Sequence, residues 1–553
     1  MLTSFKKAIN LYTRYGLNRI SYNHYSNTSF SSSQTHNNNI KFNSKNDLFK
    51  TSNNNSYQLV VGVEIHAQIK SKEKLFSDIY YKYKLPDSLN VGSLDGCIAN
   101  SRVSYVDAAF PGTLPVLNAK CVEQAIKTGL SIGASINQHS YFDRKHYFYQ
   151  DLPQGYQITQ YHQPIVKNGS LLLNLKDGRQ HNIRISHIQL EQDSGKSIHD
   201  QSSNYTLVDL NRAGIGLMEI VSEADFRSSE QVGLYVKQLQ QLLRHIGTSD
   251  ANMQLGEMRA DINISVRPEA QEEYGTRVEL KNMISIKAIT GAIDAEAMRQ
   301  IEILESGGRV TRETRGYDQT TGTTFHMRTK EDEVDYRFFP EPDLPPLRIE
   351  QSTIDKLATE LPELPEQMLE RLVTQYSIPR HEATVLVEDR RIVKYFEDVI
   401  AFGKAKNINR QPKKVMPWIL KEVFEWLNSR NETIDRCPLA VQQLAELVDL
   451  VDQGYLSSRT GKEIIEKLLD EEQNKGGSVK SLVDSMGLSQ ISDDSTLEQL
   501  CKSIVESNPK EVADYKSGKQ RVFKFFVGEI MKQTKGRSNP EKVNQYLKNY
   551  LDK

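Results

Sequence analysis

Three segments of the chain alternate apolar and polar residues, a pattern typical of β-strands with one buried face. They are QLVVGVEIHAQI at 58–69, ADINISV at 260–266 and TRVELKN at 276–282. Successive side chains of a strand point to opposite faces of the sheet, so a repeat of two gives one apolar and one polar face. The polar stretch PEAQEEYG at 268–275 predicts a hairpin between the second and third strands.

Two other segments place apolar residues at helical spacing. EQVGLYVKQLQQLLRHIG at 230–247 ends in glycine, a frequent helix stop, and so does SIKAITGAIDAEAMRQIEILESGG at 285–308. This mixture predicts an α+β domain over residues 57–350 with a large, mainly antiparallel sheet. The proline-rich stretch FFPEPDLPPL at 338–347 can continue neither a helix nor a central strand, so we expect the domain to end there.

Beyond residue 350 the apolar spacing is almost entirely helical. LPEQMLERLVTQY at 364–376 predicts a helix, and LAVQQLAELVDLVDQG at 439–454 predicts another that stops at Gly454. The segment Arg436-Cys437-Pro438 interrupts the pattern. We therefore expect one helical domain at 351–437 and a helical tail domain at 438–553.

Composition narrows the class of protein. The chain has 553 residues, of which 38% are apolar, so it can bury several cores. No apolar run approaches the roughly 18 residues that cross a bilayer, so we expect no membrane partner. The cysteines at 97, 121, 437 and 501 are too far apart for a C-x-x-C metal site and too few for a disulfide framework, which favours a reducing compartment.

The segment 1–56 differs in composition from the rest. It contains seven basic residues and one acidic residue, with Leu2, Phe5 and Ile9 among the bases. This composition is typical of an organellar presequence, and a low-complexity tail without a targeting role is the alternative. Without this segment the chain has a net charge of −7, so nucleic acid would bind only through local basic patches.

The polar faces of the predicted strands carry groups that could support chemistry. Residues i and i+2 share a face, so Glu64 and His66 project together. The same rule groups Arg259, Asp261, Asn263 and Ser265 on the second strand, and Arg277, Glu279 and Lys281 on the third. A solvated face of an antiparallel sheet is the alternative explanation of these charges.

Two further carboxylates lie in apolar sequence: Glu191 follows HIQL, and Glu219 lies inside GLMEIV. A carboxylate in apolar surroundings is costly unless it is paired or binds a cation, and oxygen ligands of this kind suit Mg²⁺. His66 is a weaker guide, because a lone histidine on a strand is more often a hydrogen-bonded structural residue than a metal ligand.

Two segments have the composition of nucleotide or RNA contacts. YFDRKHYFYQDLPQGYQITQ at 141–160 combines rings with Arg144 and Lys145, which suits base stacking and phosphate binding or, alternatively, a tyrosine-rich loop packed on the sheet. YKSGKQRVFKFFVGEIMKQTKGR at 515–537 has seven basic residues and one acidic residue. It suits an anionic partner or, alternatively, a solvated helix face.

Two common catalytic motifs are excluded. DSGKS at 193–197 ends like a Walker A loop, but residue 190 is Leu where that loop requires Gly. No G-x-S-x-G nucleophile elbow is present. Neither a P-loop NTPase nor a serine hydrolase of that type fits the chain.

Nine motifs along residues 58–551 are similar to those of one family. They are VGVEIHAQI, FPGTLPVLN, FDRKHYFYQDLPQGYQI, LEQDSGKSIHD, DLNRAGIGLMEIVSEAD, RVELKNMISIK, DYRFFPEPDLPPL, NPKEVADYKSGK and VGEIMKQTKGRSNP. The chain thus resembles the B subunits of glutamyl-tRNA(Gln) amidotransferases, the GatB/GatE family, over nearly its whole length after residue 56.

This resemblance implies a catalytic cradle at 57–350 related to the fold of glutamine synthetase and guanidino kinases, followed by the helical domain and the tail. It also implies an ATP-dependent ligase. Glutamate misacylated on tRNA(Gln) is activated to a γ-glutamyl phosphate, and ammonia that a partner amidase releases from glutamine displaces the phosphate. The implied cofactors are ATP and Mg²⁺. The implied partners are the amidase A subunit, the small C subunit and Glu-tRNA(Gln), and with a presequence the implied location is the mitochondrial matrix.

The functional residues of the family carry over to four groups in this chain. The Mg²⁺ group is Glu64, His66, Glu191, Glu219 and Glu279. The group for ATP and the acyl phosphate is Lys145, Tyr147, Tyr149, Lys196 and Arg212. The catalytic group is Glu64, Arg259, Glu279 and Lys281. The tRNA-binding group is Lys516, Lys519, Lys532 and Lys535.

The chain departs from the family pattern at two places. Many bacterial members carry a four-cysteine zinc site, whereas the matching stretch here keeps only Cys97. One thiol cannot complete tetrahedral zinc ligation, so we expect no zinc. The LEED pattern of many relatives reads LEQD, with Gln192 replacing one carboxylate, and we take the neighbouring Glu191 as the ligand.

Two other functions are compatible with the sequence. A tRNA-binding assembly subunit without catalysis would share the fold, although the complete set of carboxylates argues against it. An amidotransferase for aspartyl-tRNA(Asn) would use the same site, and only the presequence favours the glutamine route in mitochondria.

Overall fold

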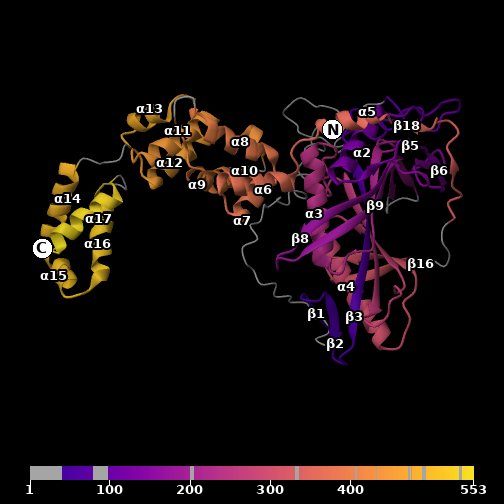
Figure 1. The fold of residues 1–553 in the computed structure, drawn as a ribbon, viewed down its shortest axis with the longest axis horizontal. Coiled ribbons are helices and arrows are strands. Elements are labelled where there is room, and N and C mark those ends of the chain that lie inside the picture. Colours follow the sequence, from indigo (N-terminus) through magenta and orange to yellow (C-terminus); the bar gives the residue numbers. More distant parts are fainter. Residues whose placement is uncertain are drawn as a thin grey trace, which may run out of the picture. The chain divides into compact units, whose positions relative to one another are not determined.

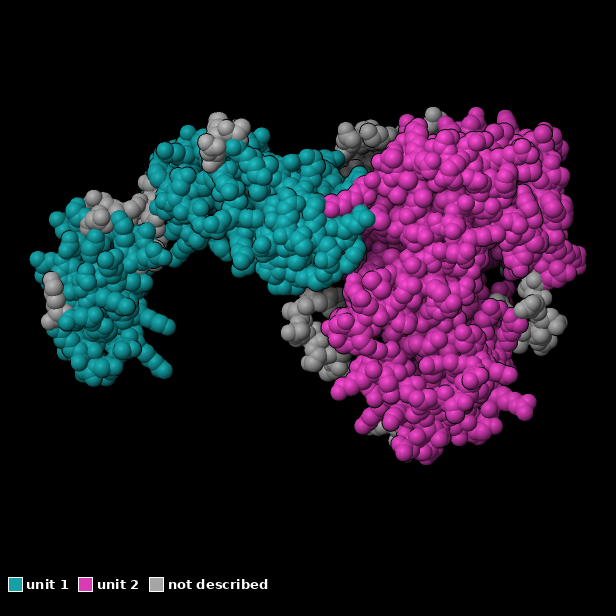
Figure 2. Space-filling view, viewed as in Figure 1, with its two compact units in different colours: residues 1–29, 366–553 teal, residues 30–365 magenta. Residues whose placement is uncertain are grey.

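The computed structural model describes residues 40–552 except 79–96, 200–204, 330–334, 405–407, 431, 471–473, 475, 489–493 and 535–537. The described residues form two compact units, one ending at Pro365 and one beginning at Glu366 (Figure 2). Each unit is described by itself below. Among the described residues, no helix combines the length and the apolar character that crossing a bilayer requires.

The first unit contains most of the strands (Figure 1). Its strands are β1 (Ile40–Asn43), β2 (Leu48–Thr51), β3 (Ser56–Gln68), β4 (Ser135–Ile136), β5 (His139–Ser140), β6 (Asp143–His146), β7 (Tyr156–Thr159), β8 (Val166–Asn174), β9 (Gln180–Gln192), β10 (Lys196–His199), β11 (Thr206–Asp209), β12 (Gly216–Ser222), β13 (Met258–Pro268), β14 (Val278–Met283), β15 (Glu313–Asp318), β16 (Thr323–Thr329), β17 (Phe339–Pro340) and β18 (Leu347–Arg348). Its helices are α2 (Ala119–Ser131), α3 (Ser229–Ile246), α4 (Ile286–Glu305) and α5 (Gln351–Thr359).

An 11-stranded sheet organises this unit, with the order β16-β15-β14-β13-β3-β12-β9-β8-β4 and with β2 and β1 joined to β3. All neighbouring pairs run antiparallel except β14 and β15, which are parallel. The predicted α+β class and mainly antiparallel sheet are confirmed. The predicted strand at 260–266 lies within β13, those at 58–69 and 276–282 overlap β3 and β14, and the hairpin between β13 and β14 is present.

Helices α3 and α4 begin and end where their sequences predict. Ser228 and Ser285 cap their first turns, each accepting a hydrogen bond from a backbone N–H three residues later. Helix α3 stops at Gly247, whose φ of 74° lies in the left-handed region that glycine adopts at low cost. The two local signals therefore suffice to set the ends of α3.

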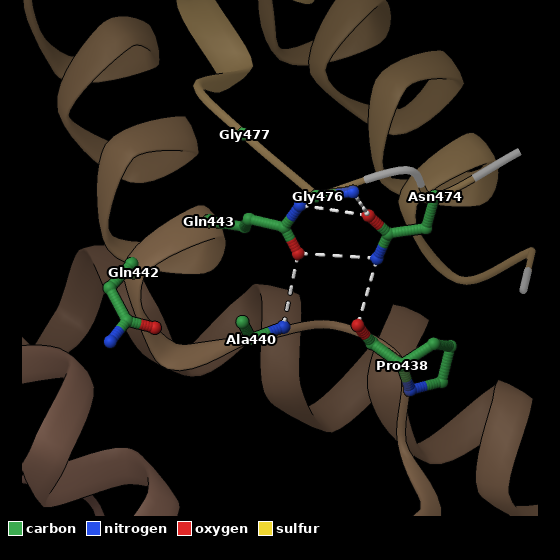
Figure 3. A pocket seen from close by; sticks show the side chains of 7 residues that line it. All are labelled: Pro438, Ala440, Gln442, Gln443, Asn474, Gly476 and Gly477. Atoms are coloured by element: carbon green, nitrogen blue, oxygen red, sulfur yellow. Dashed lines mark hydrogen bonds between the residues drawn. The ribbon is translucent and has the colours of Figure 1, made fainter.

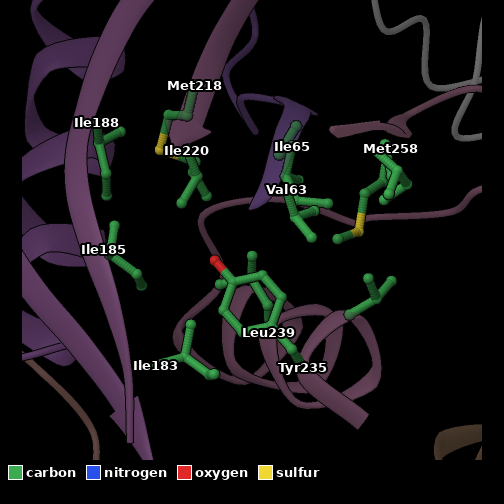
Figure 4. Close-up of a cluster of buried hydrophobic side chains, with 14 of the residues drawn as sticks. Val63, Ile65, Ile183, Ile185, Ile188, Met218, Ile220, Tyr235, Leu239 and Met258 are labelled. Atoms are coloured by element: carbon green, nitrogen blue, oxygen red, sulfur yellow. The ribbon is translucent and has the colours of Figure 1, made fainter. Parts of the chain in front are cut away.

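One face of the sheet is apolar and packs on helices. Val63 and Ile65 of β3 lie in the same core as Ile185 of β9, and this core also contains Tyr235 and Leu239 of α3 (Figure 4). Glu64 and His66 alternate with these buried residues, so they project from the opposite face. The period of two in the sequence therefore divides the central strand into a structural face and a polar face.

The folded part begins before residue 57. Strands β1 and β2 pair with each other, and β2 pairs with β3. Leu48 and Phe49 are buried in a segment whose many Asn and Ser residues led us to group it with the presequence. The last part of that segment thus belongs to the sheet, and the presequence prediction for residues 1–39 lies outside the described residues.

The first unit also extends beyond residue 350. Ile354 and Leu357 of α5 are buried in its core, and the unit ends at Pro365. The proline-rich stretch forms the short strands β17 and β18, which pair with β6 and β5. Proline therefore ends regular structure here without ending the domain.

The second unit is helical. It contains α6 (Pro365–Tyr376, at the junction), α7 (Arg380–Leu386), α8 (Arg390–Ala401), α9 (Pro412–Pro417), the π-helical turn η2 (Trp418–Val423), α10 (Phe424–Arg430), η3 (Ile434–Arg436), α11 (Val441–Asp452), α12 (Ser458–Leu468), α13 (Val479–Ser485), α14 (Asp494–Ser507), α15 (Pro509–Lys516), η4 (Gln520–Val522), α16 (Phe523–Gln533) and α17 (Pro540–Leu551).

This unit has two hydrophobic cores, and neither begins at residue 438. One core runs from Met368 to Val483 and includes Phe396 of α8 together with Leu444 of α11. The other runs from Leu497 to Leu551. The structure thus places the internal boundary after α13 rather than at 437. Pro438 lies in the loop between η3 and α11, and the helices on both sides of this loop share one core.

We predict that a fragment of residues 366–488 unfolds cooperatively in urea, whereas 366–437 shows no cooperative transition because it lacks α11 to α13. Far-UV circular dichroism would follow both fragments. Within the longer fragment, Leu444→Ala should lower the free energy of unfolding by about 2–5 kcal/mol, because Leu444 is fully buried. A cooperative transition in the shorter fragment would contradict the shared core.

Candidate active site

The polar face of the large sheet gathers acidic residues from neighbouring strands. Strand pairing places Glu219 of β12 directly opposite His66 of β3. On the other side of β3, Asp261 of β13 lies opposite Glu64. Because paired residues share a face, groups that are far apart in sequence meet in one row across the sheet.

His66, Glu191 and Glu219 form the tightest group. The Nε2 atom of His66 lies 3.5 Å from Oε1 of Glu191 and 3.8 Å from Oε2 of Glu219. One ligand atom from each residue falls within 4.8 Å of the other two. Glu191 is buried, and the other two are partly buried. Two carboxylates and an imidazole at this spacing can share one small cation.

Hydrogen bonds from neighbouring side chains hold the carboxylates of Glu191 and Glu219 in place. The Oγ1 of Thr159 donates to Oε2 of Glu191 at 3.3 Å, and Nε2 of Gln189 donates to Oε2 of Glu219 at 2.8 Å. Gln192, the residue that replaces a carboxylate in the LEQD motif, instead donates to Oε1 of Gln154 at 3.0 Å. Glu191 is therefore the member of this motif that reaches His66.

Glu191 and Glu219 differ in protonation, because burial and neighbouring charges shift their pKa values in opposite directions. Burial raises the pKa of Glu191 well above its ordinary value, and the negative charge of Glu219 adds to this effect. Burial acts in the same direction on Glu219, but His66, Lys145 and hydrogen bonds outweigh it, so the pKa of Glu219 lies below its ordinary value. Burial lowers the pKa of His66 and leaves a neutral imidazole that can bind a cation.

Glu64 and Glu279 lie outside this group of three. Glu64 accepts a hydrogen bond from Nδ2 of Asn263 at 2.8 Å, and burial, followed by the charge of Glu219, raises its pKa. Glu279 lies on β14, where it accepts from Oγ1 of Thr314 at 3.0 Å and lies 3.4 Å from Nζ of Lys281. The structure thus brings three of the five predicted Mg²⁺ residues together and places the other two beside them on the same face.

Three of the predicted cations are engaged by their surroundings. Arg259 donates to both carboxylate oxygens of Asp193 at 2.9 Å, and Lys281 donates to Asp261 at 3.0 Å. Arg212 donates to the carbonyl oxygens of Ser194 and Gly195 at 3.0 and 2.5 Å. Its guanidinium also lies 3.5 Å from the carboxylate of Asp193, so the two arginines converge on one acid.

Lys145 differs from these cations because an aromatic ring accompanies it. Its Nζ lies 5.0 Å from the ring centroid of Tyr336. Burial lowers the pKa of Lys145, but the charges of Glu191 and Glu219 outweigh burial and leave the pKa raised. Lys145 therefore remains charged within electrostatic reach of the carboxylate group.

The remaining predicted nucleotide contacts are less concentrated. Tyr147 donates to Oε1 of Gln157 at 3.3 Å, and burial raises its pKa. Tyr149 packs edge-on against Tyr147 but is 56% exposed. Lys196 is exposed on β10, in the two-stranded ribbon with β11. The sheet register does not bring Lys196 into the carboxylate row.

Some of the residues that contact the predicted site residues were predictable from the sequence, and others were not. Gln189 could have been found, because it lies two positions before Glu191 and so shares its face of β9. Thr159, Thr314 and Tyr336 reach the site from other elements. Tyr336 lies in the DYRFFPEPDLPPL motif, but nothing in the local sequence of these three residues indicates their contacts with the site.

The tRNA-binding prediction falls on the C-terminal helices. Lys516 is exposed at the end of α15, and Lys532 is exposed in the last turn of α16. Lys519 forms an ion pair with Asp514, with Nζ and Oδ1 2.9 Å apart. Lys535 lies outside the described residues. Cys97 is a free, partly buried thiol, and most of the stretch that matches the bacterial zinc site lies outside the described part of the chain.

A pocket of about 510 Å³ in the helical unit offers no comparable chemistry (Figure 3). The amides of Gln443 and Asn474 face each other there, with donor–acceptor distances of 2.9 and 3.2 Å. Asn474 also donates to the carbonyl of Pro438 at 2.8 Å. These amides bind one another and the backbone, so they connect the start of α11 to a distant loop.

Two domain families match the chain. The GatB/GatE catalytic domain matches residues 59–355. The chain belongs to the GatB/GatE family. The GatB domain matches residues 394–551, so members of this family share both the sheet and the C-terminal helices with the chain.

Named relatives cover almost the full length. The B subunit of the mitochondrial glutamyl-tRNA(Gln) amidotransferase of Dictyostelium discoideum is 59% identical over 520 residues, which cover 93% of this chain and 94% of the relative. The B subunit of the aspartyl/glutamyl-tRNA(Asn/Gln) amidotransferase of Rickettsia canadensis is 45% identical over 499 residues, 90% of this chain and 98% of the relative. The corresponding B subunit of Pelagibacter ubique is 44% identical over 498 residues, which cover 90% of this chain and 97% of the relative. The family resemblance is confirmed.

We predict that Glu191→Gln stabilises the metal-free protein at neutral pH. The native state raises the pKa of Glu191 above 4.5, so it holds this proton more tightly than the unfolded chain does. The protonated Glu191 therefore stabilises the native state in acid, and this contribution is lost as the pH rises from 4.5 through the raised pKa of Glu191. Gln stays neutral and keeps that stability.

Thermal unfolding of both proteins across a pH series, with and without Mn²⁺ as a probe cation, would test this prediction. The variant should melt at a higher temperature than the wild type at neutral pH, and it should lose the stabilisation by Mn²⁺. Glu123→Gln, an exposed helix residue paired with Lys120, is the control. A variant that melts below the metal-free wild type at neutral pH would contradict the assignment.

Proposed function

We propose that this chain is the B subunit of a mitochondrial glutamyl-tRNA(Gln) amidotransferase and that the polar face of its sheet is the site of ATP-dependent amide formation. The observation that carries the proposal is the group of His66, Glu191 and Glu219 on that face. The names of its relatives support the substrate, and its family membership supports the reaction class.

The reaction has two steps. The side-chain carboxylate of tRNA-bound glutamate attacks the γ-phosphoryl group of ATP, which gives an acyl phosphate and ADP. Ammonia then attacks the acyl carbon, and the C–O bond to phosphate breaks, which gives the amide, inorganic phosphate and a proton. A bare carboxylate resists nucleophilic attack because its leaving group would be oxide, so activation must come first.

His66, Glu191 and Glu219 would hold Mg²⁺, whose charge offsets that of the phosphoryl oxygens when it is bound. The donor set fits this role, since Glu219 is ionised, His66 is neutral and Glu191 can lose its proton to solvent when a cation binds. Lys145 would face the transferring phosphoryl group from the side of β6. Arg259 and Arg212 would bind the remaining phosphate oxygens beside Asp193.

Glu64 and Glu279 would have roles other than metal binding. Burial and the charge of Glu219 raise the pKa of Glu64, which makes it a better base than an exposed carboxylate. We assign it the proton that the attacking ammonia loses. Glu279 holds Lys281 at 3.4 Å and would thereby orient a cation at the edge of the reacting groups.

The ammonia would come from a partner. The sequence contains no recognisable amidase nucleophile, so we assign its release from glutamine to the amidase A subunit, with the small C subunit completing the complex. Glu-tRNA(Gln) would contact the exposed lysines of α15 and α16. The bacterial relatives are named for both Asp and Glu substrates, whereas the mitochondrial relative is named for glutamyl-tRNA(Gln) alone, which favours that substrate here.

We predict that Glu279→Gln lowers the rate of transamidation by roughly 10²-fold or more while tRNA binding persists, because the charge that orients Lys281 is lost. The measurement uses the complete complex with its amidase inactivated, supplied with ATP, Mg²⁺ and ammonium chloride in place of glutamine. Glu123→Gln should keep full activity. An unchanged rate for Glu279→Gln would favour a binding subunit without catalysis.

For the tRNA surface, Lys516→Ala should weaken tRNA binding. It should also reduce the slope of log Kd against log salt concentration by about one, because one fewer counterion is released on binding. Lys532→Ala should behave likewise. Lys519→Ala should have a smaller effect, because Asp514 already neutralises this lysine. Filter binding at several salt concentrations, with Lys120→Ala as control, measures all four variants. Unaltered salt slopes for Lys516→Ala and Lys532→Ala would contradict the tRNA contact.

A further inference from the structure

The site holds its cations in two different ways. Arg259 and Lys281 are hydrogen-bonded to carboxylates, which fix their positions but also offset their charge. Among the residues that the structure describes, no carboxylate forms an ion pair with Lys145, and its ammonium group instead faces the ring of Tyr336 at 5.0 Å. An aromatic ring attracts an ammonium group through its quadrupole and carries no net charge, so it can position the cation without neutralising it.

From this contrast we infer that Tyr336 is a positioning residue, which holds the Lys145 ammonium without a direct ion pair so that it can meet the transferring phosphoryl group. The inference rests on the proposed function and adds a residue that lies in the DYRFFPEPDLPPL motif but belongs to none of the four groups of functional residues. It assigns the tyrosine a role through its ring face and not through its hydroxyl group.

The surroundings of Tyr336 hold its ring in place. Its carbonyl accepts a hydrogen bond from the backbone N–H of His146 at 2.9 Å, directly beside Lys145. The ring packs edge-on against Tyr147, with centroids 6.2 Å apart, and against Phe338 at 5.9 Å. Phe338 in turn stacks on Tyr161 at 4.0 Å. The ring therefore has neighbours on two sides.

The strands add a second constraint on this geometry. Strand β17 pairs with β6 through Phe339 and Arg144, so the segment that carries Tyr336 runs alongside the strand that carries Lys145. Arg144 stacks over the ring of Tyr156 at 4.2 Å and forms an ion pair with the buried Glu341 at 2.7 Å. Ring and cation thus sit on two backbone segments that are hydrogen-bonded to each other.

The test compares Tyr336→Leu with Tyr336→Phe in the complete complex, with the amidase inactivated and ammonium chloride as the nitrogen donor. Phe keeps the ring face, so it should retain kcat within about twofold, whereas Leu should lower kcat by about 5- to 30-fold with little change in KM for Glu-tRNA(Gln). Tyr274→Leu is the matched control, because Tyr274 makes the same kind of contact, at 5.4 Å, with Arg267 outside the site.

The double variant with Lys145→Ala separates positioning from packing. If Tyr336 acts through Lys145, adding Tyr336→Leu to Lys145→Ala should cost little further activity. An equal additional loss in the double variant, or an equal loss in Tyr336→Phe and Tyr336→Leu, would overturn the inference. Thermal unfolding checks that each variant is folded.

Two outcomes distinguish this inference from the proposed function. Full activity of Tyr336→Leu beside an impaired Lys145→Ala would overturn the positioning role and leave the proposed function standing. Full activity of Lys145→Ala would overturn the positioning role and also remove Lys145 from the proposed site, while the test at Glu279 would still decide whether the sheet face is catalytic.

Discussion

The register in which β3 pairs with its two neighbours determines the rest of the site. Glu219 lies opposite His66 on one side, and Asp261 lies opposite Glu64 on the other. A slip of one residue on β3 would turn these polar groups into the core and expose Val63 and Ile65. The apolar face packed on α3 therefore does more than stabilise the fold, because it fixes which acidic side chains meet.

Gathering acids in this way has an electrostatic cost that the protein limits locally. Glu191 is buried beside Glu219, and two ionised carboxylates in that position would repel each other strongly. Retention of one proton, the hydrogen bonds from Thr159 and Gln189, and the charge of Lys145 reduce the cost without removing it. The divalent cation that we propose for this site would reduce the cost further.

Much of this could be predicted from local sequence. Alternation identified β3, β13 and β14 and the face that carries Glu64, His66 and Glu279, and the apolar context of Glu191 and Glu219 marked them as unusual. The order of strands in the sheet was not predictable in this way. That order sets Glu279 apart from the other proposed ligands and brings Thr314 to it through the parallel pairing of β14 and β15.

Domain ends were less predictable, because the prolines and the Asn-rich composition on which we based them do not coincide with the ends of the hydrophobic cores. Pro438 lies in a loop between helices of one core, and the Asn-rich segment before residue 57 contains the buried pair Leu48 and Phe49. The role of Tyr336 was not predictable for a related reason, since its partner Lys145 lies much earlier in the chain and the two meet only through long-range contacts between their segments. Local pattern describes single strands and helices, whereas these features depend on long-range contacts.

The strand order also has a consequence for how the molecule is made. Strand β3 lies near the start of the chain and ends at Gln68, but its partners β12 and β13 end only at Ser222 and Pro268. While the chain emerges from a ribosome or crosses a membrane through a translocation channel, β3 lacks both central partners until these much later segments have followed it. Contacts of such long range form slowly and leave strand edges exposed in the meantime. The central strand of this site is therefore the segment that most needs protection from aggregation before folding is complete.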